Sequence, residues 1–127
     1  MKFENIENII VWQKAKTLAL ETSASLVNCK DPLLKEMTRK SAITLMNTIA
    51  EWFEKKNKKE LSDCLYFTKE ICGAYRSMVH LCLELGFLDA SSHQKLIDAS
   101  IDVTKLLCGF IKRIREDNAK KESETVA

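Results

Sequence analysis

Apolar residues recur every three or four positions through most of this 127-residue chain. That spacing places them on one face of an α-helix. Four segments carry such a stripe, at about residues 8–29, 31–56, 57–86 and 91–116. The chain has only 3 Gly and 1 Pro, too few for the many tight turns of a sheet-rich fold. The sequence therefore predicts an all-α protein with four amphipathic helices.

The starts of the first two helices are marked by residues that satisfy unpaired backbone groups. Asn8 is suited to cap the first helix, since its side-chain oxygen can accept from backbone N–H groups of the first turn. Asp31 can cap the second helix in the same way, and Pro32 fits the first helical position, where its missing N–H costs nothing. We expect the second helix to end near Lys56.

The third and fourth helices carry comparable boundary signals. Asn57 and Glu60 have the spacing of a capping box, in which each side chain bonds the other residue's backbone N–H. Gly86 can adopt the left-handed conformation that ends a helix. Ser91 and Gln94 form a second box that opens the fourth helix.

Short connections between these helices make neighbours antiparallel, which predicts an up-down-up-down antiparallel four-helix bundle over residues 1–116. The polar segment 117–127 is expected to be a disordered tail. The residues expected in the core are Ile9, Trp12, Ala15, Leu18, Ala19, Thr22 and Leu26, then Leu34, Thr38, Ser41, Leu45, Thr48 and Trp52, then Leu61, Leu65, Thr68, Cys72, Tyr75, Val79 and Cys82, and finally Leu96 or Ile97, Ile101, Thr104, Leu107 or Cys108, Ile111 and Ile114.

Some apolar residues exceed what one core stripe needs. The runs at residues 9–12 and 64–67 are continuously apolar, so they cover more than one helix face. A subunit interface would use the surplus, and a broader core stripe is the alternative. The expected interface residues are Ile10, Trp52, Phe53, Tyr66 and Phe67.

Composition excludes several classes of protein. No apolar run is long enough to span a membrane, and the N-terminal residues lack the apolar core of a signal peptide. The five cysteines are odd in number and include no C-x-x-C pair. They therefore do not indicate a disulfide framework, which favours a reducing cytoplasm. Cys64, Cys72 and Cys82 are expected to pack as small apolar residues, and redox or metal roles are the alternative.

No catalytic or metal-binding motif is present. Helical-bundle metal sites use E-x-x-H, but Ser77 and Ala90 stand three residues before His80 and His93. Glycine-rich phosphate loops, G-x-S-x-G and H-E-x-x-H are all missing from the sequence. We expect no enzymatic activity, no metal and no cofactor.

Positive charge is concentrated although the net charge is only +2. Residues 31–59 hold seven basic and four acidic groups (+3), whereas residues 60–90 hold two basic and five acidic groups (−3). The second and fourth helices of an up-down-up-down bundle end at the same pole, where these cations could contact a phosphate backbone. Alternatively, they complement helix dipoles and keep a turn soluble. The residues concerned are Lys55, Lys56, Lys58, Lys59, Lys112, Arg113 and Arg115.

Several short motifs resemble the proteins encoded in intervening sequences of 23S ribosomal RNA genes. Residues 11–15 read V-W-Q-K-A, and residues 49–51 read I-A-E. Arg39 and Lys40 stand at a basic pair of the family, and residues 59–61, which read K-E-L, stand at its K-E-F. ELGFL lies near the end of the third helix. The likeness covers about residues 6–114. The chain departs from that family pattern at three positions: Met46 replaces a proline, Thr48 an asparagine and Trp52 a glycine.

The resemblance implies a four-helix bundle that assembles as a cyclic homo-oligomer, a pentamer. Related accessory proteins of diversity-generating retroelements use a basic surface to engage nucleic acid and a reverse transcriptase. We therefore expect a non-enzymatic homo-oligomer that binds RNA or DNA by backbone contacts, with Arg39 and Lys40 added to the contact residues. The alternative is an interaction scaffold that docks a protein partner on surplus apolar faces.

Overall fold

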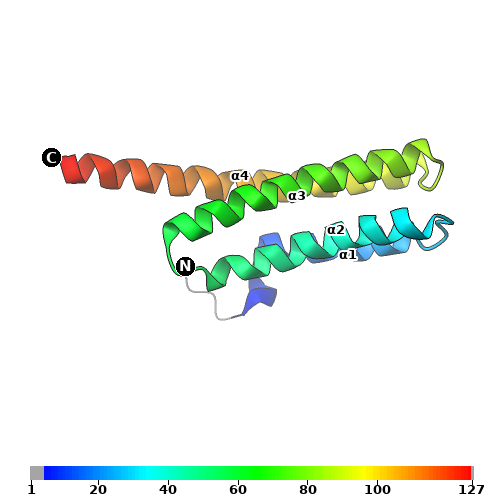
Figure 1. Ribbon diagram of the computed structural model, residues 1–127, viewed down its shortest axis with the longest axis horizontal. Helices are drawn as coiled ribbons and strands as arrows, with labels where there is room; N and C mark the ends of the chain where they lie inside the picture. Colours follow the sequence, from blue (N-terminus) through cyan, green and yellow to red (C-terminus); the bar gives the residue numbers. More distant parts are fainter. Residues whose placement is uncertain (1–4, 127) are drawn as a thin grey trace.

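Four antiparallel helices pack side by side in the computed structural model, which describes residues 5–126 (Figure 1). The helices are α1 (Ile10–Ser25), α2 (Pro32–Glu51), α3 (Lys58–Glu84) and α4 (Ala90–Val126), with 3-10 turns η1 (Ile6–Asn8) and η2 (Trp52–Glu54). Helix α1 packs on α2 and α4, and α3 packs on α2 and α4. The described part of the chain contains no strand. The all-α four-helix bundle predicted from the sequence is confirmed.

Three of the predicted helix boundaries are found where expected. The Asp31 carboxylate accepts from the backbone N–H of Leu34 at 3.0 Å. The Asn57 side chain accepts from the N–H of Glu60 at 2.9 Å, and Gly86 ends α3 with φ at 81°. Glu60 bonds the N–H of Lys56 instead of that of Asn57, at 3.1 Å. Two hydrogen bonds therefore stabilise the turn after α2, one accepted by Asn57 and one accepted by Glu60.

Other predicted boundaries are wrong. Asn8 lies inside η1, and Ile9 occupies the N-cap of α1 without a side-chain hydrogen bond. Helix α4 is capped by Asp89, whose carboxylate accepts from the N–H of Ser92 at 2.6 Å. Ser91 is thus a residue of the first turn. Helix α2 ends at Glu51, because the chain tightens into η2 before the lysines begin.

The buried side chains follow the predicted stripes with shifts of one or two positions. Ala42 is fully buried beside the half-buried Ser41. Ile101 is 38% exposed, whereas Ser100 and Val103 are fully buried. A period of 3.6 residues lets either of two adjacent positions face the core, and the neighbouring helices decide between them.

Four threonines, three of them buried and Thr104 half-buried, join the helices through one recurring pattern. Each donates its hydroxyl proton to the carbonyl four residues earlier on its own helix, which leaves the oxygen free to accept. Thr22 then accepts from the Tyr75 hydroxyl at 2.6 Å, and Thr104 accepts from the Arg76 guanidinium at 2.9 Å. No buried side-chain N or O among the described residues lacks a partner. The threonines with this bond are Thr22, Thr38, Thr68 and Thr104.

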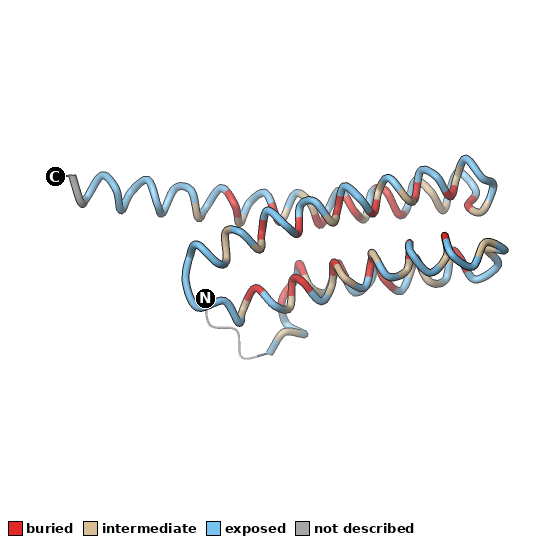
Figure 2. Tube along the Cα trace, viewed as in Figure 1, coloured by how far each residue is buried: buried red, intermediate tan, exposed pale blue. Residues whose placement is uncertain are grey.

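Helix α4 extends well beyond the other three helices (Figure 1). Every residue from Arg115 to Glu124 is exposed, which Figure 2 shows as an unbroken pale-blue stretch before the C-terminus. The segment expected to be disordered is thus helical up to Val126. The loss of burial begins close to the predicted domain boundary at residue 116. Because a short exposed helix is marginal in water, fraying of residues 117–127 in solution remains a prediction.

Candidate nucleic-acid interface

The lysines of the α2–α3 connection are exposed, but their charge is balanced locally. Residues 51–63 contain four lysines and four carboxylates, which come from Glu51, Glu54, Glu60 and Asp63, so their sum is zero. Lys59 forms an ion pair with Asp63 at 3.2 Å. This connection alone therefore provides no strong positive field.

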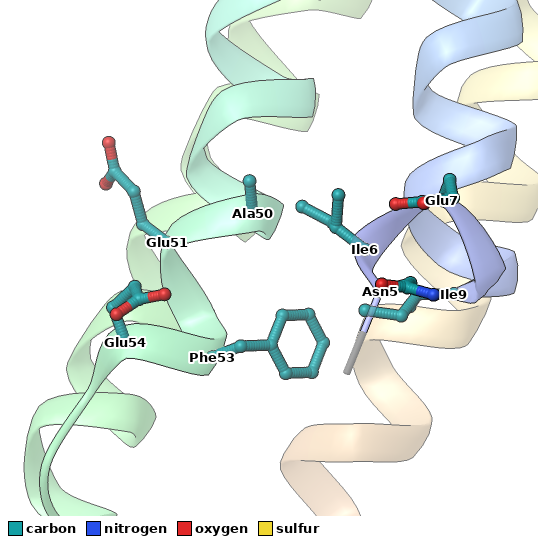
Figure 3. A pocket seen from close by; sticks show the side chains of 8 residues that line it. All are labelled: Asn5, Ile6, Glu7, Ile9, Ala50, Glu51, Phe53 and Glu54. Atoms are coloured by element: carbon teal, nitrogen blue, oxygen red, sulfur yellow. The ribbon is translucent and has the colours of Figure 1, made fainter. Parts of the chain in front are cut away.

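The α2–α3 connection lies at one end of the bundle, called here the pole, and one side of this pole is acidic. A pocket of about 500 Å³ opens between η1 and the end of α2. Figure 3 shows the ring of Phe53 directed toward Ile6 and Ile9, with Glu7 on the side of the isoleucines and Glu51 and Glu54 on the side of α2 and η2. Three carboxylates line this pocket, so it does not suit a phosphate. They belong to Glu7, Glu51 and Glu54.

On the other side of the pole, the first turns of α3 pack against residues 108–117 of α4, as expected for antiparallel neighbours. Lys58 and Arg113 line one pocket of about 190 Å³, whose apolar walls include Trp52 and Phe110. Asp117 lines the same pocket and offsets part of their charge.

A second hollow, of about 170 Å³, lies between the outer faces of α3 and α4. Arg115 donates a hydrogen bond to the Tyr66 hydroxyl, and its guanidinium lies 5.5 Å from the centre of the Tyr66 ring. No carboxylate lines this hollow. Its lining, named here the α3–α4 basic groove, consists of Tyr66, Lys69, Cys108, Ile111, Lys112 and Arg115.

The positive charge of the α3–α4 basic groove is not neutralised by ion pairs. Among the described residues, Lys69, Lys112 and Arg115 form no ion pair. Residues 103–115 of α4 contain four basic groups and no acidic one, so this stretch carries +4. This stretch of α4 therefore carries a net positive charge without acidic neighbours inside it.

Helical spacing extends this cationic face along both helices. Lys105 precedes Cys108 by three residues, so it lies on the same side of α4. Arg76 follows Lys69 by seven residues on α3 and donates to Ser100 and Thr104 of α4. Sequence reasoning missed Lys69, Arg76 and Lys105. The seven-residue spacing of cations on two facing helices, Lys69 and Arg76 on α3 and Lys105 and Lys112 on α4, was the signal that could have identified them.

Arg39 and Lys40 lie apart from the pole. They precede Trp52 by 13 and 12 residues, which is about 20 Å along a helix axis. Arg39 pairs with Glu36 at 3.9 Å. Lys40 lines a shallow hollow between α2 and α3 with Met37 and Ile71. The structure does not bring this pair together with the other predicted contact residues.

The residues expected at a subunit interface do not form one surface. Trp52 is 2% exposed and packs edge-on against Phe110, so it belongs to the core of its own chain, and we correct its assignment. Phe53 is half-buried, and Tyr66 lies in the basic groove. Ile10 on α1 is 63% exposed, beside α4.

Phe67 belongs to a second apolar stripe on α3 that sequence reasoning did not separate from the core stripe. Its members alternate steps of four and three, as in a helix that packs along a partner. Leu33 and Met37 of the adjacent α2 are also exposed. We name this stripe the α3 outer stripe: it consists of Phe67, Ile71, Ala74, Met78, Leu81 and Leu85.

The histidines and cysteines show no cluster of metal-ligand residues. The Nδ1 atom of His80 and the Nε2 atom of His93 lie 2.9 Å apart between α3 and α4, a pairing that sequence reasoning missed. Within residues 5–126, no group of three or more His, Cys, Asp or Glu side chains could hold a metal ion. All five cysteines are free, and burial raises the pKa of the Cys72 and Cys82 thiols.

No described helix is long and apolar enough to cross a membrane.

Comparison with known proteins agrees with the bundle. A crystal structure from Bacteroides thetaiotaomicron VPI-5482, described as a protein with unknown function from the S23 ribosomal protein family, superposes with a TM-score of 0.75 at 17% identity. The match covers 81% of this chain and 99% of that one. A search of curated proteins finds no significant match. The family model for the 23S rRNA-intervening sequence protein matches residues 7–109, so this chain belongs to that family.

Proposed function

We propose that this chain is a non-enzymatic, homo-oligomeric bundle of the bacterial cytoplasm that binds nucleic acid through its phosphate backbone. The single observation that supports this is the α3–α4 basic groove, where Lys69, Lys112 and Arg115 face solvent without ion pairs. The family's name refers to 23S rRNA, so a structured RNA is the first ligand to test.

Phosphate contacts suit this surface better than sequence readout. The lysine side chains are flexible point charges, which bind phosphates without distinguishing bases. Arg113 and Lys58 line a separate pocket between the same two helices and would add further phosphate contacts there. Lys55, Lys56 and Lys59 would add weaker contacts, because carboxylates surround them. Because Arg39 and Lys40 lie apart from this pole, in an oligomer they would contact a nucleic acid bound at the groove of a neighbouring subunit.

Self-assembly is supported by the α3 outer stripe. Phe67, Leu81 and Leu85 are 52%, 48% and 52% exposed, although they are large and apolar. Large contiguous apolar surface is uncommon on a protein that stays monomeric. A ring of subunits would cover the stripe and repeat each basic groove around its axis, which multiplies contacts with one nucleic acid. The pentamer implied by the resemblance belongs to this proposal.

Charge reversal tests the nucleic-acid assignment. Lys69→Glu combined with Lys112→Glu should weaken binding of a labelled structured RNA by at least about tenfold, since two phosphate contacts become repulsive. Lys30→Glu is the matched control, because Lys30 is exposed at the opposite end of the bundle. Equal affinity of the double variant and the wild type would remove the groove from the proposal.

A protein-interaction scaffold is the second candidate, and the same exposed stripe favours it. If the chain is monomeric in solution, the α3 outer stripe is free to bind another protein. Light scattering on a sizing column measures the oligomeric state of the wild type and of Leu81→Glu, and so distinguishes self-assembly from the scaffold. A wild-type oligomer that Leu81→Glu converts to monomer supports self-assembly. A wild-type monomer that binds no RNA favours the scaffold.

A further inference from the structure

The α3–α4 basic groove has a more specific chemistry than a positively charged surface. Its polar lining consists of three cationic side chains, one tyrosine and one thiol, within about 170 Å³. The cations come from two helices and surround one hollow, whereas the lysines at residues 55–59 lie in sequence along the α2–α3 connection and the first turn of α3. Such concentrated charge favours a compact ligand with more than one negative charge.

The contact between Arg115 and Tyr66 leaves a further hydrogen-bond donor, the Tyr66 hydroxyl, available to a ligand. Arg115 donates to the Tyr66 oxygen, so the phenol acts as the acceptor in that bond. The hydroxyl proton of Tyr66 stays available to a ligand, because a phenol can accept and donate at once. The guanidinium also lies over the Tyr66 ring, 5.5 Å from its centre, which restricts its position.

We infer that the α3–α4 basic groove binds a phosphate monoester, the dianionic group found at the end of a nucleic-acid strand and on free nucleotides. A phosphodiester within a strand carries one charge and two ester oxygens. A monoester near neutral pH carries up to two charges and three terminal oxygens, which match the donors of Lys69, Lys112, Arg115 and Tyr66.

The strand end as the source of this group rests on the nucleic-acid binding proposed above. A chain that holds a strand along the cationic face of α3 and α4 would place the strand's terminal phosphate in this groove. The groove would then distinguish phosphorylated ends from hydroxyl ends, which backbone contacts alone cannot do.

The test compares two short single-stranded RNAs of identical sequence, one with a 5′-phosphate and one with a 5′-hydroxyl. We expect the phosphorylated strand to bind the full chain about tenfold more tightly, as a lost charge-assisted hydrogen bond would predict. Tyr66→Phe and Lys69→Gln should reduce this preference, whereas the distant Lys30→Gln should not. Equal binding of both strands overturns the monoester inference and leaves the nucleic-acid proposal standing. If neither single strand nor a structured RNA binds at low salt, the monoester inference and the nucleic-acid proposal are both overturned.

Cys108 gives a readout located in the groove itself. It is the one exposed cysteine among the described residues, since Cys29 and Cys64 are half-buried and Cys72 and Cys82 are buried. The phosphorylated strand should slow maleimide labelling of Cys108, located by peptide mass spectrometry, more than the hydroxyl strand does. Unchanged labelling would place the binding elsewhere and overturn the inference. Equal protection by adenosine monophosphate at the same concentration would overturn the strand end as the source.

Discussion

The indole Nε1 of Trp52 donates a hydrogen bond to the Thr68 hydroxyl, with 3.0 Å between the two atoms. The Thr68 hydroxyl in turn donates a hydrogen bond to the backbone carbonyl of Cys64, with 2.7 Å between the two oxygens. Because Trp52 also packs on Phe110 of α4, this one side chain joins the turn after α2 to both α3 and α4. A residue that departs from the family pattern thus has a structural role here.

Thr68→Val should destabilise the chain by about 1–3 kcal/mol, because the variant keeps the shape but leaves the buried Trp52 N–H without an acceptor. Urea unfolding followed by tryptophan fluorescence measures the change. Thr17→Val, on the exposed face of α1, is the matched control and should stay within about 0.5 kcal/mol of the wild type. Equal stability of Thr68→Val and the control would contradict the role given to this bond.

Most of the fold was predictable from the sequence, because apolar spacing and capping residues act locally. Asp31, Asn57 and Gly86 each mark a boundary through chemistry within three or four residues. The errors arose where a local choice depends on distant residues. Asp89 caps α4 although Ser91 is an equally good capping residue in sequence.

The candidate site was predictable only in part. Lys112 and Arg115 were identified from sequence, but their partner Lys69 was not, because it lies 43 residues before Lys112 and in an acidic segment. Tyr66 was expected at an interface of apolar residues. Its contact with Arg115 depends on the register between α3 and α4, which no local pattern specifies.

Alkaline pH should destabilise the wild type through Tyr75. Burial raises the pKa of Tyr75 to about 12, against the ordinary value of 10.0. The folded chain therefore keeps this proton between pH 10 and 12 while the unfolded chain loses it. This stabilisation is complete below pH 10 and falls by about 1.4 kcal/mol per pH unit between pH 10 and about 12, above which both states have lost the proton. Tyr75→Phe should lose about 1 kcal/mol at neutral pH and show a shallower decline above pH 10. Parallel curves for the two proteins would contradict this account.

The caps at the start of α4 can be compared directly. Hydrogen bonds from Ser92 lower the pKa of Asp89, so its contribution to stability is present above the ordinary carboxyl pKa and is lost as pH falls through the lowered value. Asp89→Ala should lower the melting temperature at pH 7 by several degrees, and Ser91→Ala should leave it nearly unchanged. A larger loss in Ser91→Ala would reverse the assignment of the cap.

Removal of residues 119–127 tests the boundary of the domain. The side chains at residues 119–124 are all exposed, so their loss should change the melting temperature by less than about 2 °C. Hydrogen exchange on the full chain should show rapid exchange of the same amides, as expected for a fraying helix end. Strong protection of these amides would show that the overhang of α4 is covered by another surface in solution.

Fluorescence anisotropy of a labelled structured RNA, measured from low to physiological salt, tests whether the α3–α4 basic groove binds nucleic acid. We expect micromolar or tighter affinity at low salt and a steep linear fall of log affinity with log salt concentration. That slope should become shallower when Lys69 and Lys112 are changed to glutamate. An absence of binding even at low salt would mean that the cations of the α3–α4 basic groove only solvate a helix surface, and would contradict the proposed function.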